Sequence, residues 1–116
     1  MVFLEKNEGI DIVRFGNDRI NALNVDTIRP AIMRLFDIPH SRAVIDLSGV
    51  NYLDSTGFAM FLHMLRVARA NYCTFRFCSL TPAAQNLFDT LQLNKVFDIY
   101  SDFDSCLQSF VRGGPA

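Results

Sequence analysis

The 116-residue sequence lacks the features that mark nucleic-acid-binding and membrane-spanning proteins. Its 11 basic residues are balanced by 12 acidic ones, so the net charge is −1 and no basic excess exists to hold a phosphate backbone. No apolar run approaches the ~20 residues that cross a bilayer, and the N-terminus has no basic segment followed by an apolar one, as a signal peptide has. We therefore expect no direct nucleic-acid partner, no membrane insertion and a cytoplasmic location.

Cysteine and histidine are too few and too scattered for a metal site or a redox pair. Cys73, Cys78 and Cys106 include no C-x-x-C pair, and only His40 and His63 could join them. We interpret the cysteines as small buried apolar residues in a reducing compartment, and we expect no cofactor. Neither histidine has an evident acidic residue to orient it as a base, so the sequence predicts a protein that is not an enzyme.

The sequence does contain a large apolar fraction arranged in short elements. Half of the residues are apolar and 11 are Phe, which is enough for one core. We expect a single domain over residues 1–112 and a flexible C-terminal tail over residues 113–116. An opening hairpin is followed by strands that alternate with helices, a pattern typical of an α/β fold with a mostly parallel sheet. Thr81 and Pro82 mark a helix start, and residues 95–100 are expected to form a strand.

The segment Asp54-Ser55-Thr56-Gly57 stands between a predicted buried strand and a predicted helix over residues 55–70. One interpretation is helix capping alone, since the first three side chains all accept hydrogen bonds from free amides. Two features exceed that need: three capping residues in succession, and a glycine that costs roughly 0.5–1 kcal/mol in a helix relative to Ala. Such a glycine suggests that a backbone or another molecule approaches closely.

A serine at a helix N-terminus is also a suitable carrier of a phosphate. The helix dipole and the free amides would tolerate the added charge of about −1.5 to −2 at Ser55 without unfolding the helix. The neighbouring Asp54 would repel that charge and sharpen the electrostatic change that a partner meets. The pattern therefore fits a modification that changes a surface and leaves the fold intact.

The predicted helix over residues 55–70 is apolar around more of its circumference than one core face requires. One side carries four large apolar residues and three more widen the arc: Phe58, Phe61, Leu62 and Leu65, then Met60, Met64 and Val67. Two interpretations stay open. Either the helix is wedged between the sheet and its neighbours, or the last three residues form an exposed docking strip beside Ser55, since methionine suits adaptable binding surfaces.

Residues 43–57, AVIDLSGVNYLDSTG, resemble the signature segment of STAS domains, the anti-sigma-factor-antagonist family. A later segment is similar to the third helix of that family, with Leu80, Thr81, Pro82, Leu87, Phe88 and Leu91 as the matching residues. The similarity runs over about residues 2–111, nearly the whole chain. It implies a single STAS-like domain of the α/β class, with a mixed, mostly parallel sheet of about four to five strands and four helices packed largely on one side.

The resemblance also implies a function. In the family, the serine directly after the motif Asp is phosphorylated by a serine-kinase anti-sigma factor; this position is Ser55 here, and Thr56 is a second candidate. The unphosphorylated form binds the anti-sigma factor and releases the sigma factor, and a PP2C-type phosphatase resets the switch. The implied partner-binding residues are Asp54, Ser55, Thr56 and Gly57, and the docking strip of Met60, Met64 and Val67 that the apolar arc suggests would extend this surface. Asp54 would orient the loop, and Gly57 would permit close approach.

Non-switching members of the family supply the alternative. A scaffold or accessory subunit, of a stressosome or of a lipid transporter, would form a stable partner complex that is insensitive to charge at Ser55. A switch predicts the opposite: Ser55→Asp weakens partner binding by at least ~1–3 kcal/mol, while Ser55→Ala binds and resists modification.

Overall fold

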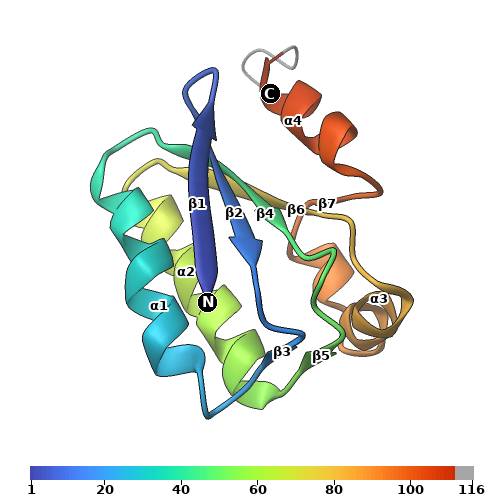
Figure 1. Cartoon of the computed structure of the whole chain (residues 1–116). Coiled ribbons are helices and arrows are strands. Elements are labelled where there is room, and N and C mark those ends of the chain that lie inside the picture. The colour runs from blue at the N-terminus through green and yellow to red at the C-terminus, as the bar shows by residue number, and fades with distance from the viewer. Residues whose placement is uncertain (112–116) are drawn as a thin grey trace.

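The chain opens with a tight hairpin, as expected. β1 (Val2–Asn7) and β2 (Ile10–Phe15) pair antiparallel across a turn in which Glu8 and Gly9 both have positive φ, 53° and 78°. A two-residue turn of this kind matches the right-handed twist of the flanking strands. The computed structural model describes residues 1–111, so the predicted flexible tail lies outside the described residues (Figure 1).

The hairpin is one edge of a five-stranded sheet with the order β1-β2-β4-β6-β7. β4 (Arg42–Asp46) is parallel to β2 and to β6 (Thr74–Cys78), and β6 is parallel to β7 (Ile99–Tyr100). Only the hairpin is antiparallel, so the predicted mixed and mostly parallel sheet is confirmed. A second sheet pairs β3 (Arg19–Ile20) with β5 (Tyr52–Leu53), also in parallel, next to the carboxyl end of β4.

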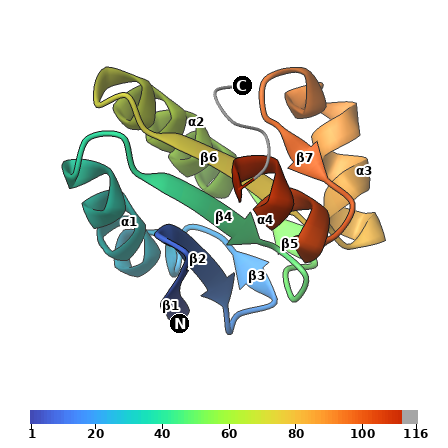
Figure 2. The same ribbon diagram turned by 90° about the horizontal axis from the view of Figure 1, so that it is seen from above.

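Three of the four helices belong to one side of the five-stranded sheet. α1 (Val25–Met33) and α2 (Ser55–Ala70) lie side by side on one face, and α3 (Pro82–Thr90) joins the same core through Phe88 (Figures 1 and 2). α4 (Phe103–Val111) packs on the opposite face. The predicted α/β architecture with four helices largely on one side is confirmed.

Two short 3-10 helices also occur within residues 1–111. One, Arg34–Asp37, continues α1, and the other, Leu93–Lys95, follows α3. The predicted strand over residues 95–100 is therefore wrong except for its last two residues. Phe97 turns into the main core instead, and only Ile99–Tyr100 pairs with β6.

The main core lies between the sheet and the first three helices and is dense in Phe. The rings of Phe61 and Phe77 meet edge to face at 4.9 Å, and Phe88 meets Phe77 at 5.6 Å. Such aromatic pairs contribute about 0.5–1.5 kcal/mol beyond the area that they bury. This packing fixes α2 against the sheet and so sets the position of its N-terminus.

A smaller core lies beneath α4. Cys106 and Leu107 of α4 pack there against Val44 and Cys78 of the sheet. All three cysteines of the chain are buried and unbridged, as predicted. None of the helices in the described range, residues 1–111, is long and apolar enough to cross a membrane.

Candidate functional site

Asp54 fixes the first turn of α2. Its Oδ1 accepts hydrogen bonds from the backbone amides of Thr56 (3.0 Å) and Gly57 (3.1 Å) and from the Thr56 hydroxyl (2.5 Å). The Thr56 hydroxyl, with the amides of Gly57, Ala22 and Thr56, lowers the pKa of the Asp54 carboxyl below its usual value. Asp54 is therefore a charged cap at neutral pH, where the helix dipole favours a negative group.

The second oxygen of Asp54 reaches a distant part of the chain. Oδ2 accepts a hydrogen bond from the backbone amide of Ala22 (3.1 Å), in the loop between β3 and α1. Two asparagines shape that loop: Asn24 Oδ1 accepts from the Asn21 amide and Asn21 Oδ1 from the Leu23 amide, both at 3.0 Å. Leu23, in the same loop, is 92 % exposed. Asparagines favour such turns, because their side chains accept hydrogen bonds from nearby backbone amides.

Gly57 is buried, and its missing side chain makes room for β3. A Cβ at this position would stand 3.0 Å from the carbonyl oxygen of Ile20 and 3.3 Å from Ile20 Cγ2. The predicted close approach is thus made by the chain's own backbone. Gly57 is buried and so offers little surface of its own, and its role in partner binding stays a prediction.

Ser55 is the exposed member of the motif. Within residues 1–111, no hydrogen bond involves its hydroxyl, whereas the hydroxyl of the half-buried Thr56 is engaged with Asp54. Ser55 therefore offers the more accessible of the two hydroxyls. The amides that were expected to be free to tolerate a phosphate are in part occupied, because Asp54 accepts from those of Thr56 and Gly57. A charge on Ser55 would add to that of Asp54.

The predicted docking strip along α2 is not on the surface. Met60 is 1 % exposed and Met64 is fully buried, and both belong to the main core. Val67 is half-buried and packs against the same core. The structure therefore contradicts Met60 and Met64 as contact residues, and it supports the interpretation of a wedged helix.

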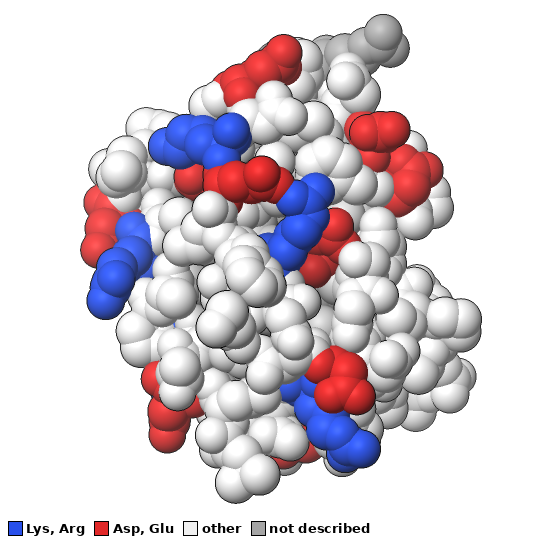
Figure 3. All heavy atoms as spheres, viewed as in Figure 1, with Lys and Arg blue, Asp and Glu red and all other residues white. Residues whose placement is uncertain are grey.

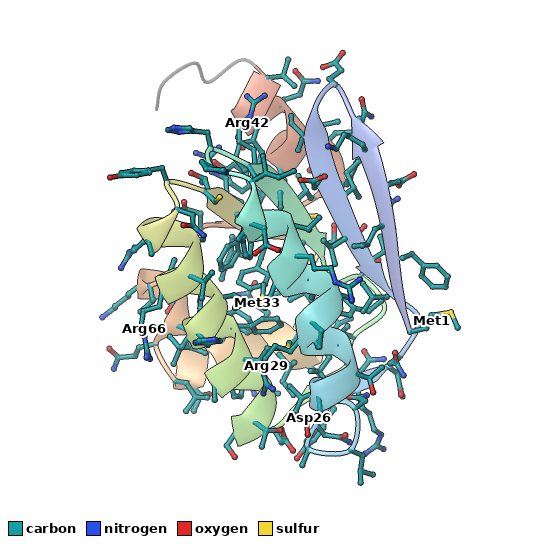
Figure 4. All side chains as sticks on the ribbon, turned by 90° about the vertical axis from the view of Figure 1, so that its left-hand side faces the viewer. Met1, Asp26, Arg29, Met33, Arg42 and Arg66 are labelled. Carbon is teal, nitrogen blue, oxygen red and sulfur yellow. The ribbon has the colours of Figure 1, made fainter. Side chains whose placement is uncertain are left out.

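The cause is that α2 has neighbours on several sides. Phe58 and Phe61 meet Phe88 of α3 at 5.9 and 6.4 Å, the sheet lies beneath, and α1 runs alongside (Figure 4). Each neighbour covers part of the apolar arc. The exposed side of α2 carries small or polar residues, Ala59, His63, Arg66 and Ala70. In Figure 4, the labelled Arg66 projects outward from the helix.

These observations place one exposed hydroxyl at the junction of β5 and α2, on a helix end braced by a second loop. A family model for the STAS domain matches residues 2–106, which include the whole of this junction. The chain belongs to the STAS domain family. The match spans every strand of the domain and helices α1 to α3, so the family assignment rests on the fold as a whole.

Solved structures share the fold of this STAS domain at low sequence identity. An anti-sigma-factor antagonist (STAS) domain protein from Planctomyces limnophilus superposes with a TM-score of 0.87 at 16% identity, covering 95% of this chain and 97% of that one. An anti-sigma factor antagonist from Mycobacterium paratuberculosis gives 0.80 at 23% identity, covering 94% and 92%. The anti-sigma factor antagonist SpoIIAA in its unphosphorylated form gives 0.77 at 17% identity, covering 97% of each chain. These likenesses establish the fold, and no curated protein matches the chain in sequence.

Proposed function

We propose that this STAS domain is an anti-sigma factor antagonist and not an enzyme. In its unphosphorylated form it binds a serine-kinase anti-sigma factor and so releases a sigma factor, and phosphate on Ser55 switches this binding off. The observation that carries the proposal is the free, exposed hydroxyl of Ser55 on a helix end that Asp54 holds rigid. The three similar structures, all described as anti-sigma factor antagonists, support it.

The switch acts through charge and leaves the shape of the site unchanged. Asp54 is ionised and keeps the amides of Thr56 and Gly57, so the phosphate projects from Ser55 toward solvent beside a carboxylate. A charge of about −1.5 to −2 then lies on a surface that a partner must desolvate on binding. Binding weakens for that reason, and a PP2C-type phosphatase restores it by removing the charge.

Leu23 adds an apolar contact to the same surface. The Ala22 amide ties its loop to Asp54, so Leu23 and Ser55 are parts of one braced unit. Full burial of a leucine side chain against a partner is worth about 1.5–3 kcal/mol. The contact surface is therefore centred on Leu23, Asp54 and Ser55, and it does not extend along the buried methionines of α2.

Phosphorylation is tested directly by mass spectrometry of the protein purified from its own host, where we expect phosphate on Ser55. A pull-down with Ser55→Ala then captures the partner for identification. We expect Ser55→Asp to weaken that complex by at least ~1–3 kcal/mol, about 5- to 150-fold in affinity. Leu23→Ala should weaken it as well without preventing phosphorylation.

Ser105→Asp is the matched control. Ser105 is also exposed in the first turn of a helix, α4, where its amide donates to a capping aspartate, Asp102. That helix lies on the opposite face of the sheet (Figure 2). Ser105→Asp should leave the complex unchanged. Absence of phosphate together with a partner complex that tolerates Ser55→Asp would reject the switch in favour of a constitutive scaffold or accessory subunit.

A further inference from the structure

Among the elements of residues 1–111, none covers the edge strand β1. Figures 1 and 2 both show it as the outermost strand, with its free edge away from the rest of the domain. The opposite edge strand, β7, has two residues, whereas β1 has six. Long open edges are normally shortened, covered or charged, because their unpaired backbone groups recruit other strands. β1 is therefore the open edge available for pairing.

The hairpin register shows which backbone groups of β1 are free. Asn7 and Ile10 close a two-residue turn and so form a hydrogen-bonded pair. Bonded and non-bonded pairs then alternate along the antiparallel ladder. Val2, Leu4 and Lys6 consequently direct their N–H and C=O groups away from β2, toward the open edge.

The same edge exposes large apolar side chains on both faces of the strand, since Phe3 and Leu4 are neighbours and point to opposite faces. Met1 is 71 % exposed, Phe3 53 % and Leu4 49 %. Figure 3, which views this face, shows uncharged surface over its middle, a band of mixed acidic and basic residues above, and further charged residues toward the lower left and lower right. Apolar side chains beside unpaired backbone groups favour a strand as the occupant of this edge.

We propose that β1 is the pairing edge of a homodimer, in which β1 of a second copy adds antiparallel and joins the two five-stranded sheets into one. A two-fold axis at Leu4 pairs this residue with its own equivalent and pairs Val2 with Lys6 in both directions. Each bonded pair exchanges two hydrogen bonds, so the junction gains about six. Every outward-facing group of the three residues is then satisfied.

The charges along β1 select this occupant and this register. With the axis at Leu4, Glu5 lies opposite Phe3 and Lys6 opposite Val2, so no charge meets its own equivalent. A shift of two residues toward the turn would place Glu5 opposite Glu5, and like charges directly opposite are destabilising. A shift of two residues the other way would leave the outward-facing groups of Lys6 without a partner. The net charge of −1 adds little repulsion between two copies.

Sedimentation analysis over about 1 to 300 µM full-length protein tests the dimer by mass action. The average mass of the wild type should rise toward twice that of the monomer. Leu4→Lys places two ammonium groups at the axis and should raise the dissociation constant at least about tenfold. Leu91→Lys, at another half-exposed leucine remote from β1, is the matched control and should leave it unchanged.

Amide hydrogen exchange gives a readout that needs no variant. The amides of Val2, Leu4 and Lys6 should exchange more slowly as concentration rises, while those of Phe3 and Glu5, already bonded to β2, should not respond. A wild type that stays monomeric at every concentration would overturn the proposal. So would association that Leu4→Lys does not weaken, or protection that does not alternate along β1.

Discussion

The N-termini of α2 and α4 are built alike but hold together different parts of the chain. In each, an aspartate caps the first turn: Asp54 binds the Gly57 amide at 3.1 Å, and Asp102 binds the Ser105 amide at 2.7 Å. Both carboxyl groups have lowered pKa values, Asp102 chiefly through the Ser105 amide. Each turn also carries an exposed serine.

The difference lies in the second carboxylate oxygen. Within residues 1–111, that of Asp102 accepts from its neighbour, the Ser101 hydroxyl, at 3.3 Å, whereas that of Asp54 accepts from Ala22, 32 residues earlier. The end of α4 is thus a local cap, and the end of α2 is a cap that also braces a second loop. A helix end and a second loop form one surface when the capping side chain hydrogen-bonds to both, as Asp54 does and Asp102, in the described part of the chain, does not.

The largest expected difference in stability is at the third helical position of each turn. Gly57→Ala improves helix propensity by about 1 kcal/mol, but its Cβ would press on the Ile20 carbonyl, and such overpacking costs about 1–3 kcal/mol. We expect a net loss of about 1 kcal/mol in the free energy of unfolding, measured by urea denaturation.

Ser105→Ala is the corresponding change in α4, where the side chain is exposed. Its effect should stay within about 0.5 kcal/mol. If Gly57→Ala instead stabilised the protein, the close packing of β3 against α2 would not constrain this position, and the contrast between the two helix ends would lose its main structural basis.

Much of the fold was predictable because its signals are local. The apolar run of β4 and the cap at Thr81, whose hydroxyl accepts from the Ala84 amide at 3.1 Å, each specify their own element. The extent of the strand within residues 95–100 could not be predicted, because the length of a strand depends on the neighbouring strand with which it pairs. β7 pairs only where β6 reaches it, at Phe77 and Cys78.

The site was predictable only in part, for a related reason. Periodicity shows how wide the apolar arc of α2 is, but it does not show which neighbours cover it, so the exposure of Met60 and Met64 was overestimated. Gly57 was recognised as a point of close approach, yet only the tertiary structure identifies Ile20 as the group that approaches. The bond from Ala22 to Asp54 is long-range and has no sequence pattern.

Removal of each capping aspartate should distinguish a cap that protects amides of its own helix turn from one that also protects an amide of a distant loop. Asp54→Ala deletes the acceptor for the Ala22 amide, so exchange of that amide should accelerate about tenfold or more, as expected when a net stabilisation of about 1.4 kcal/mol is lost. Asp102→Ala should accelerate exchange at Ser105 and leave Ala22 unchanged. Equal exchange at Ala22 in both variants would show that the brace contributes nothing to the loop.

The smallest expected effect is on the acid titration of the two caps. Because its pKa is lowered on folding, Asp54 stabilises the fold above the usual aspartate value, near 3.9, and this contribution is lost as the pH falls through the lowered pKa. Thr56→Val keeps the shape of the side chain but removes the hydroxyl that is the largest cause. Carboxyl carbon NMR should then find the pKa of Asp54 closer to its usual value and that of Asp102 unchanged, while Ser105→Ala should shift only Asp102. If Thr56→Val left the pKa of Asp54 unchanged, the backbone amides alone would account for its lowered value, as in an ordinary helix cap.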